Sequence, residues 1–67
     1  MVYRINGVEV CFYFFIFIKE QLKKYDITFS DTYELEKDKN GKDCRVRVLS
    51  ADAAKIAGIC SSFNIPF

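Results

Sequence analysis

The sequence predicts an α+β fold of two layers, in which a four-stranded antiparallel sheet carries two helices on one face. Two Asn-Gly pairs, Asn6-Gly7 and Asn40-Gly41, each separate two runs of alternating apolar and polar residues. Asn-Gly favours a two-residue type I′ turn, because both central positions of that turn need a positive φ. A helical pattern follows each predicted hairpin, so the expected order of elements is ββαββα.

Charge supports the strand registers that these two turns dictate. About the first turn, Arg4 lies opposite Glu9, between the apolar pairs Ile5–Val8 and Tyr3–Val10. About the second turn, the expected pairs are Glu36–Arg45, Leu35–Val46, Glu34–Arg47 and Tyr33–Val48. Opposite charges then share one face of the sheet and apolar residues share the other. The residues expected to face the helices are Tyr3, Ile5, Val8, Val10, Tyr33, Leu35, Val46 and Val48, and those expected to face water are Arg4, Glu9, Glu34, Glu36, Arg45 and Arg47.

The first hairpin-helix unit spans residues 1–25, and a connector at 26–31 follows it. Its strands are expected at Val2–Ile5 and Val8–Cys11, and its helix runs from Phe12 to about Tyr25. Lysines in the last turn of this helix suit the negative end of the helix dipole. The order of the four strands is not predicted, because the two hairpins can meet along more than one edge.

The second hairpin-helix unit spans residues 32–67, with strands expected at Thr32–Lys39 and Lys42–Leu49. Ser50 is the expected N-cap of the second helix, with Asp52 in its first turn. The helix is expected to end near Phe63, where Asn64 suits a left-handed C′ position before Pro66.

Size and composition describe one small globular domain over residues 1–67. Hydrophobic residues make up 51% of the chain and charged residues 28%, which is ordinary for a folded protein. A chain this short buries only about 60% of the surface that its unfolded state exposes. Its core is therefore marginal, and a second subunit is an expected source of stability. The net charge of +1 favours neither nucleic acid nor a strongly acidic partner.

The cysteines and the apolar segments point to a reduced, cytoplasmic protein without a membrane partner. Three cysteines, Cys11, Cys44 and Cys60, are an odd number without close spacing, and no secretion signal precedes them. The apolar run Val8–Ile18 is shorter than the roughly 20 residues that span a bilayer.

The first predicted helix carries more apolar surface than one sheet needs. One stripe of this helix is sufficient to dock it on the sheet: Cys11, Phe14, Phe15, Ile18, Leu22 and Tyr25. Four bulky residues on the opposite arc, Phe12, Tyr13, Ile16 and Phe17, are left over. We interpret these four as a protein interface, since they would expose several hundred Å² of apolar surface. The alternative is that the second helix or the connector covers them within the same chain.

The sequence lacks the residues from which catalytic sites are usually built. It contains no histidine, no CxxC, no cluster of metal-ligating residues and no phosphate-binding loop. We therefore expect no enzyme activity, no cofactor and no metal site. Cys11 lies at the start of the first helix, where a thiol pKa can fall, but burial on the core stripe is the favoured interpretation.

The favoured functional hypothesis is a small, homodimeric protein-binding module. It would act as an inhibitor or an adaptor by occupying the surface of another protein. The residue usage is that expected from an AT-rich coding sequence. Such usage is associated with short proteins of phages and mobile elements. We therefore expect a protein that acts in the host cytoplasm and blocks a host enzyme or defence system. A second hypothesis is a protein that sequesters a small molecule or nucleotide in a pocket at the subunit contact. A third is weak nucleic-acid binding. Either ligand would be contacted by Arg4, Arg45 and Arg47.

Overall fold

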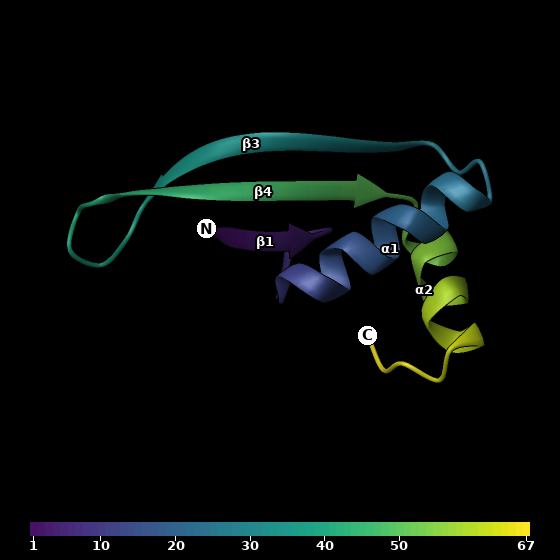
Figure 1. Ribbon diagram of the computed structural model, residues 1–67. Coiled ribbons are helices and arrows are strands. Elements are labelled where there is room, and N and C mark those ends of the chain that lie inside the picture. The colour runs from purple at the N-terminus through teal and green to yellow at the C-terminus, as the bar shows by residue number, and fades with distance from the viewer.

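The computed structural model describes all 67 residues as one mixed sheet with two helices. The strands are β1 (Val2–Ile5), β2 (Val8–Val10), β3 (Phe29–Lys37) and β4 (Asp43–Ala51), and the helices are α1 (Phe12–Lys24) and α2 (Ala53–Ser62). The strand order is β2-β1-β4-β3 (Figure 1). The α+β class with four strands and two helices is thus confirmed. The sheet is mixed, and not antiparallel throughout, because β1 runs parallel to β4.

The first hairpin has the predicted register, with Arg4 opposite Glu9. Asn6 and Gly7 have φ values of 48° and 83°, as a type I′ turn requires. The Asn6 side chain also joins the turn to the end of β4. Its amide group donates to the carbonyl oxygen of Ala51 at 2.9 Å and accepts from the N–H of Ala51 at 3.0 Å.

The register predicted for the second hairpin is wrong by one residue. Tyr33 lies opposite Arg47 and Leu35 opposite Arg45, so the expected Glu36–Arg45 and Glu34–Arg47 pairs do not form. Gly41 has a φ of 77°, whereas Asn40 keeps a negative φ. The connection is therefore a type I turn closed by a left-handed glycine, which forms a three-residue loop and not a two-residue one.

Asp38 explains why this turn forms. Its Oδ1 accepts hydrogen bonds from the N–H groups of Asn40 at 2.8 Å and Lys42 at 3.0 Å. The N–H of Gly41 donates to the Asp38 carbonyl oxygen at 3.0 Å. Aspartate at the first position and glycine at the fourth are the residues that a type I turn prefers.

The shift in register exchanges the two faces of β3 and β4, since neighbouring residues of a strand point to opposite faces. Tyr33 and Leu35 stay on the helix side as predicted, but Arg45 and Arg47 join them there. Val46 and Val48 lie on the far face, contrary to the prediction. Val46 is still buried. Arg4 of β1 and Glu36 of β3 form an ion pair on that face, and the register places their contact over Val46.

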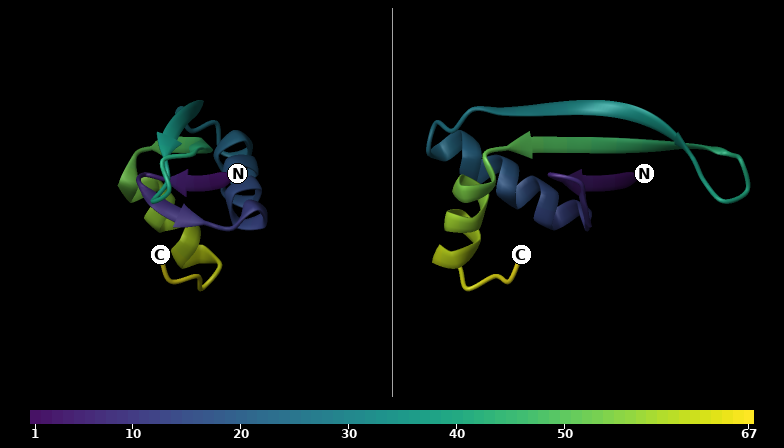
Figure 2. Two further views of the ribbon diagram at one scale, coloured as in Figure 1. Left: turned by 90° about the vertical axis from the view of Figure 1, so that its left-hand side faces the viewer. Right: turned by 180° about the vertical axis from the view of Figure 1, so that it is seen from behind.

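One hydrophobic core lies between the sheet and the two helices. α1 crosses one face of the sheet, and α2 packs against α1 near the end of β4 (Figures 1 and 2). The core residues are Ile5, Phe15, Ile18, Leu22, Leu49, Ile56, Ile59 and Cys60.

Both helices begin with a side-chain cap and end with a residue at positive φ. Cys11 caps α1, its Sγ accepting from the N–H of Phe14 at 3.5 Å. Asp52 caps α2 by accepting from Ala54 and Lys55. The predicted cap, Ser50, instead belongs to β4. Asn64, with a φ of 56°, occupies the predicted left-handed position, and Ile65 folds back to donate to the Cys60 carbonyl oxygen at 2.8 Å.

The outer part of the second hairpin projects beyond the rest of the molecule. β1 pairs with β4 only from Val46 to Leu49, so residues 35–45, which we call the arm, have no neighbouring strand except each other. The two further views show the arm extending past both helices (Figure 2). The molecule is accordingly elongated, with extents of 39 × 22 × 18 Å.

Candidate interaction surface

A row of aromatic side chains crosses the helix side of the molecule, from the start of α1 to the base of the arm. We call it the aromatic row, and it consists of Tyr13, Phe12, Tyr3, Phe15 and Tyr33. The ring centroids of Tyr3 lie 5.2 Å from those of both Phe12 and Phe15. Phe12 in turn lies 5.7 Å from Tyr13. These distances are typical of attractive aromatic pairs.

Arg47 connects the row to the arm. Its guanidinium carbon lies 4.9 Å from the ring centroid of Phe15 and 5.6 Å from that of Tyr33, so the cation lies between two aromatic faces. The row is therefore continuous from α1 to β3. Leu35 follows Tyr33 on the same face of β3.

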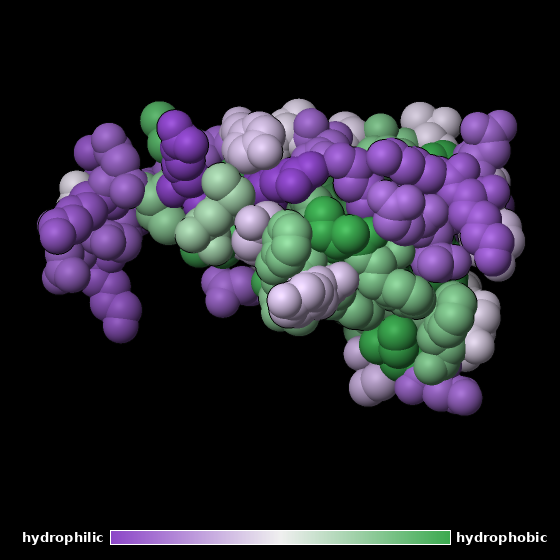
Figure 3. All heavy atoms as spheres, in the orientation of Figure 1, coloured by the Kyte–Doolittle hydropathy of each residue, from purple (hydrophilic) through white to green (hydrophobic).

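The two ends of this surface are exposed and its centre is buried. The exposed fractions are 82% for Tyr13, 45% for Phe12, 65% for Tyr33 and 70% for Leu35, whereas Phe15 is fully buried. Figure 3 shows hydrophobic residues gathered over α1 and α2, while the tip of the arm is hydrophilic. At the α1 end Tyr13 packs on Phe12 and Phe12 packs on Tyr3, whereas at the other end the Tyr33 ring contacts Arg47.

The four residues of the predicted interface separate into two pairs. Phe12 and Tyr13 are exposed in the aromatic row. Ile16 and Phe17 are half-buried against the core, because the end of α2 covers Phe17. The rings of Phe17 and Phe63 meet edge to face with centroids 5.0 Å apart.

Asp31 joins α1 to the sheet beside the aromatic row. Arg47 donates to both Asp31 oxygens, at 3.1 Å from Nε and 2.8 Å from Nη2, and Lys19 Nζ approaches the same carboxylate at 2.5 Å. The hydrogen bond from Arg47 is the main reason why the pKa of Asp31 is lowered, and the same bond raises the pKa of Arg47. Arg47 is therefore fully occupied within the molecule.

The three arginines predicted to share a water-facing surface do not lie together. Arg4 lies on the far face of the sheet, where its ion pair with Glu36 lowers the pKa of that carboxyl group. Arg45 and Arg47 lie on the helix side, and of these two only Arg45 is exposed. The structure thus offers no set of converging guanidinium groups.

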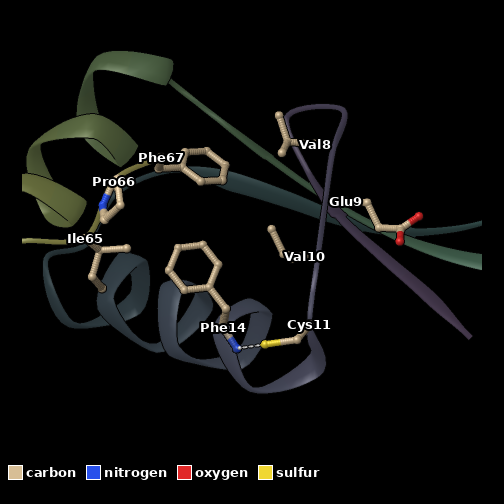
Figure 4. A pocket seen from close by; sticks show the side chains of 8 residues that line it. All are labelled: Val8, Glu9, Val10, Cys11, Phe14, Ile65, Pro66 and Phe67. Atoms are coloured by element: carbon tan, nitrogen blue, oxygen red, sulfur yellow. Dashed lines mark hydrogen bonds between the residues drawn. The ribbon is translucent and has the colours of Figure 1, made fainter.

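A shallow apolar hollow also lies at the start of α1, between the first hairpin and the C-terminal residues (Figure 4). It has a volume of about 390 Å³ and is lined by Val8, Glu9, Val10, Cys11, Phe14, Ile65, Pro66 and Phe67. The Phe14 and Phe67 rings lie 5.6 Å apart across it. Cys11 is exposed here and does not belong to the core, where the sequence placed it.

The structure contains no group of three or more His, Cys, Asp or Glu side chains that could hold a metal ion. No helix combines the length and the hydrophobicity that crossing a lipid bilayer requires. Comparison of the chain with protein-family models, with curated proteins and with solved structures found no match. Its function is therefore inferred from the surface itself.

Sequence reasoning missed the exposure of Tyr33 and Leu35, which it assigned to the space under the helices. A signal was present, since Asp38 and Gly41 are spaced as the first and fourth residues of a type I turn. That turn gives the observed register and places Arg45 beside Leu35. The length of the arm beyond the helices has no comparable signal in the sequence.

Proposed function

We propose that the chain is a non-enzymatic protein-binding module that covers part of a partner protein with the aromatic row and Leu35. The observation that supports this proposal is the exposure of Phe12 and Tyr13 at one end of the aromatic row, and of Tyr33 and Leu35 at the other. Aromatic anchors on packed neighbours are typical of the residues that dominate binding energy at interfaces. By occupying its partner's surface, the module would inhibit the partner. A cytoplasmic location suits the three free cysteines, because thiols stay reduced there.

The size of the surface agrees with this role. At about 100 Å² each, its four exposed side chains offer about 400 Å² of apolar area. This falls within the roughly 300–600 Å² of the largest patch on a typical monomer, which is often functional. Burying it against an equal apolar area is worth about 20 kcal/mol gross, which exceeds the roughly 4–15 kcal/mol that association costs.

The test compares two tyrosines that differ only in place. Tyr13 lies in the aromatic row, whereas Tyr25 is exposed at the other end of α1. We expect Tyr13→Ser to lose the partner protein that the wild type captures from cells of its source, and Tyr25→Ser to retain it. Equal capture by both variants would contradict the proposal, and circular dichroism verifies that both are folded.

Weak nucleic-acid binding is a second candidate, and the corrected register is the observation that favours it. Arg45 is exposed on the same face as Tyr33, and its cross-strand neighbour is Leu35, with no glutamate opposite it. An exposed aromatic ring can stack on a base of a single strand, and a neighbouring arginine can neutralise a phosphate. A gel shift with single-stranded DNA at low salt tests this candidate. It predicts retardation by the wild type and none by Arg45→Glu.

A further inference from the structure

β3 is an edge strand with an unusually regular outer side. It is the last strand of the sheet, and its pairing with β4 continues without interruption over nine residues, from Phe29–Ala51 to Lys37–Asp43. It contains neither a proline nor a bulge, two of the devices that prevent an edge from pairing with another chain. The other edge strand, β2, has only three residues.

The backbone groups on this outer side can be identified from the turn. The N–H of Asp38 donates to the carbonyl oxygen of Lys42, so Asp38 points its backbone groups toward β4. Because these groups alternate along an antiparallel strand, Glu36, Glu34, Thr32 and Ser30 also point toward β4. The unpaired N–H and C=O groups belong to Phe29, Asp31, Tyr33, Leu35 and Lys37.

We infer that the outer edge of β3 pairs antiparallel with β3 of a second copy of this chain, on a two-fold axis at Tyr33. This inference goes beyond the proposed function, since it concerns the backbone edge of β3 and a second copy of the chain. It shares only Tyr33 and Leu35 with the surface proposed for the partner protein, and not Phe12 and Tyr13. The resulting homodimer has one continuous sheet of eight strands, with both α1 helices on the same side.

Charge selects this register among those that a two-fold axis allows. An axis at Glu34 or at Glu36 sets that glutamate opposite itself, and an axis at Leu35 sets Glu34 opposite Glu36 of the second copy. Like charges directly opposite each other are destabilising. An axis at Tyr33 creates no like-charge pair and uses all nine residues of β3, whereas an axis at Thr32 uses fewer. The pairs at Tyr33 are Phe29–Lys37, Ser30–Glu36, Asp31–Leu35, Thr32–Glu34 and Tyr33–Tyr33.

The same register gives residues 35–37 of the arm a neighbouring strand. Leu35 comes to lie beside Asp31 of the second copy. Within each copy, Asp31 forms an ion pair with Lys19 of α1. The exposed Leu35 and Tyr33 side chains are then flanked by the helix layer of the second copy. The edge supplies about ten hydrogen bonds, two for each pair of outward-facing residues, which is the number found in a typical interface.

Self-crosslinking tests the register, in a background in which Cys11 and Cys44 are changed to serine. Tyr33→Cys places two thiols opposite each other with Cα atoms about 5.5 Å apart, within the range that a disulfide spans. Leu35→Cys is the matched control, because its two thiols lie four residues apart along the strand, about 13 Å. We expect Tyr33→Cys to form a covalent dimer under mild oxidation and Leu35→Cys to stay uncrosslinked.

Light scattering provides the second measurement. We expect the wild type to have twice the monomer mass of 7.8 kDa, and Tyr33→Lys to be monomeric, because it sets two cations opposite each other on the axis. Tyr25→Lys, which adds the same charge far from β3, is expected to stay dimeric. A monomeric wild type, or crosslinking of Leu35→Cys and not of Tyr33→Cys, would overturn the inference. Neither result affects the Tyr13 experiment, which tests the proposed function alone.

Discussion

Asp26 and Asn64 occupy equivalent positions just after α1 and α2, with φ values of 55° and 56°. Asparagine tolerates this left-handed conformation well, and an aspartate here also faces the negative end of the helix dipole. We therefore predict that Asp26→Asn raises the free energy of unfolding by about 0.5 kcal/mol, measured by urea denaturation. Asn64→Asp is the matched reverse change and is expected to lower stability by a similar amount. If Asp26→Asn lowered the free energy of unfolding and Asn64→Asp raised it, this explanation would be contradicted.

Asp31 makes stability depend on pH. Its pKa is lowered from the ordinary value of 3.8 by Arg47 and Lys19, so the folded protein holds the carboxylate in its charged form. The stabilisation is therefore complete above about pH 5, and it is lost as the pH falls below 4 toward the lowered pKa. We predict that Asp31→Asn costs about 2 kcal/mol at neutral pH and weakens the loss of stability in acid. Unfolding curves between pH 2 and 7 measure both effects.

The control for Asp31 is Asp43, which forms an ion pair with Lys37 on the exposed arm. Exposed ion pairs contribute little to stability. We expect Asp43→Asn to keep the acid dependence of the wild type. If Asp31→Asn and Asp43→Asn behaved alike, the network between α1 and the sheet would not be the source of the pH dependence.

At the scale of elements, the two Asn-Gly turns have the same sequence but different roles. Asn6 has a positive φ and makes two hydrogen bonds to Ala51, whereas Asn40 has neither feature. We predict that Asn6→Ala destabilises the protein by about 2 kcal/mol, and that Asn40→Ala changes stability by less than about 0.5 kcal/mol. Thermal unfolding of the two variants measures the contrast. Equal losses would show that the second turn also depends on asparagine.

These turns also show which parts of the fold a sequence can predict. Asn6-Gly7 gave the correct register because nothing nearby competes with a type I′ turn. At Asn40-Gly41 the Asp38 side chain stabilises a type I turn instead, and one residue of shift reverses both strand faces. The parallel pairing of β1 with β4 was not predictable, since it depends on contacts between units and not on local sequence.

The exposed aromatic surface was predicted only at its α1 end. Helical periodicity correctly identified Phe12 and Tyr13 as residues outside the docking stripe, and both are exposed. It could not show that Phe63, at the end of α2, covers Phe17, because that contact joins distant segments. The exposure of Tyr33 and Leu35 follows from the length of the β3–β4 hairpin beyond α1, which is a property of the assembled sheet.

At the scale of the whole molecule, stability is concentrated at one end. The core residues lie between α1, α2 and the adjacent strands, while the arm has no helix beneath it (Figure 2). Segments with few buried apolar contacts open more readily than the core. A second copy beside β3 would cover residues 35–37, the part of the arm that lies next to the core.

Hydrogen exchange distinguishes an unpaired outer edge of β3 from one that is paired with a second copy. In a monomer the N–H of Glu34 is bonded to β4, whereas the N–H groups of Tyr33 and Leu35 point outward. We therefore predict rapid exchange at Tyr33 and Leu35 in dilute solution, and at least tenfold slower exchange once the concentration favours the dimer. Glu9, whose N–H points outward from the β2 edge, is the internal control and should exchange rapidly throughout. Protection that appeared at Glu9 and not at Tyr33 would place the contact between copies on the opposite edge of the sheet.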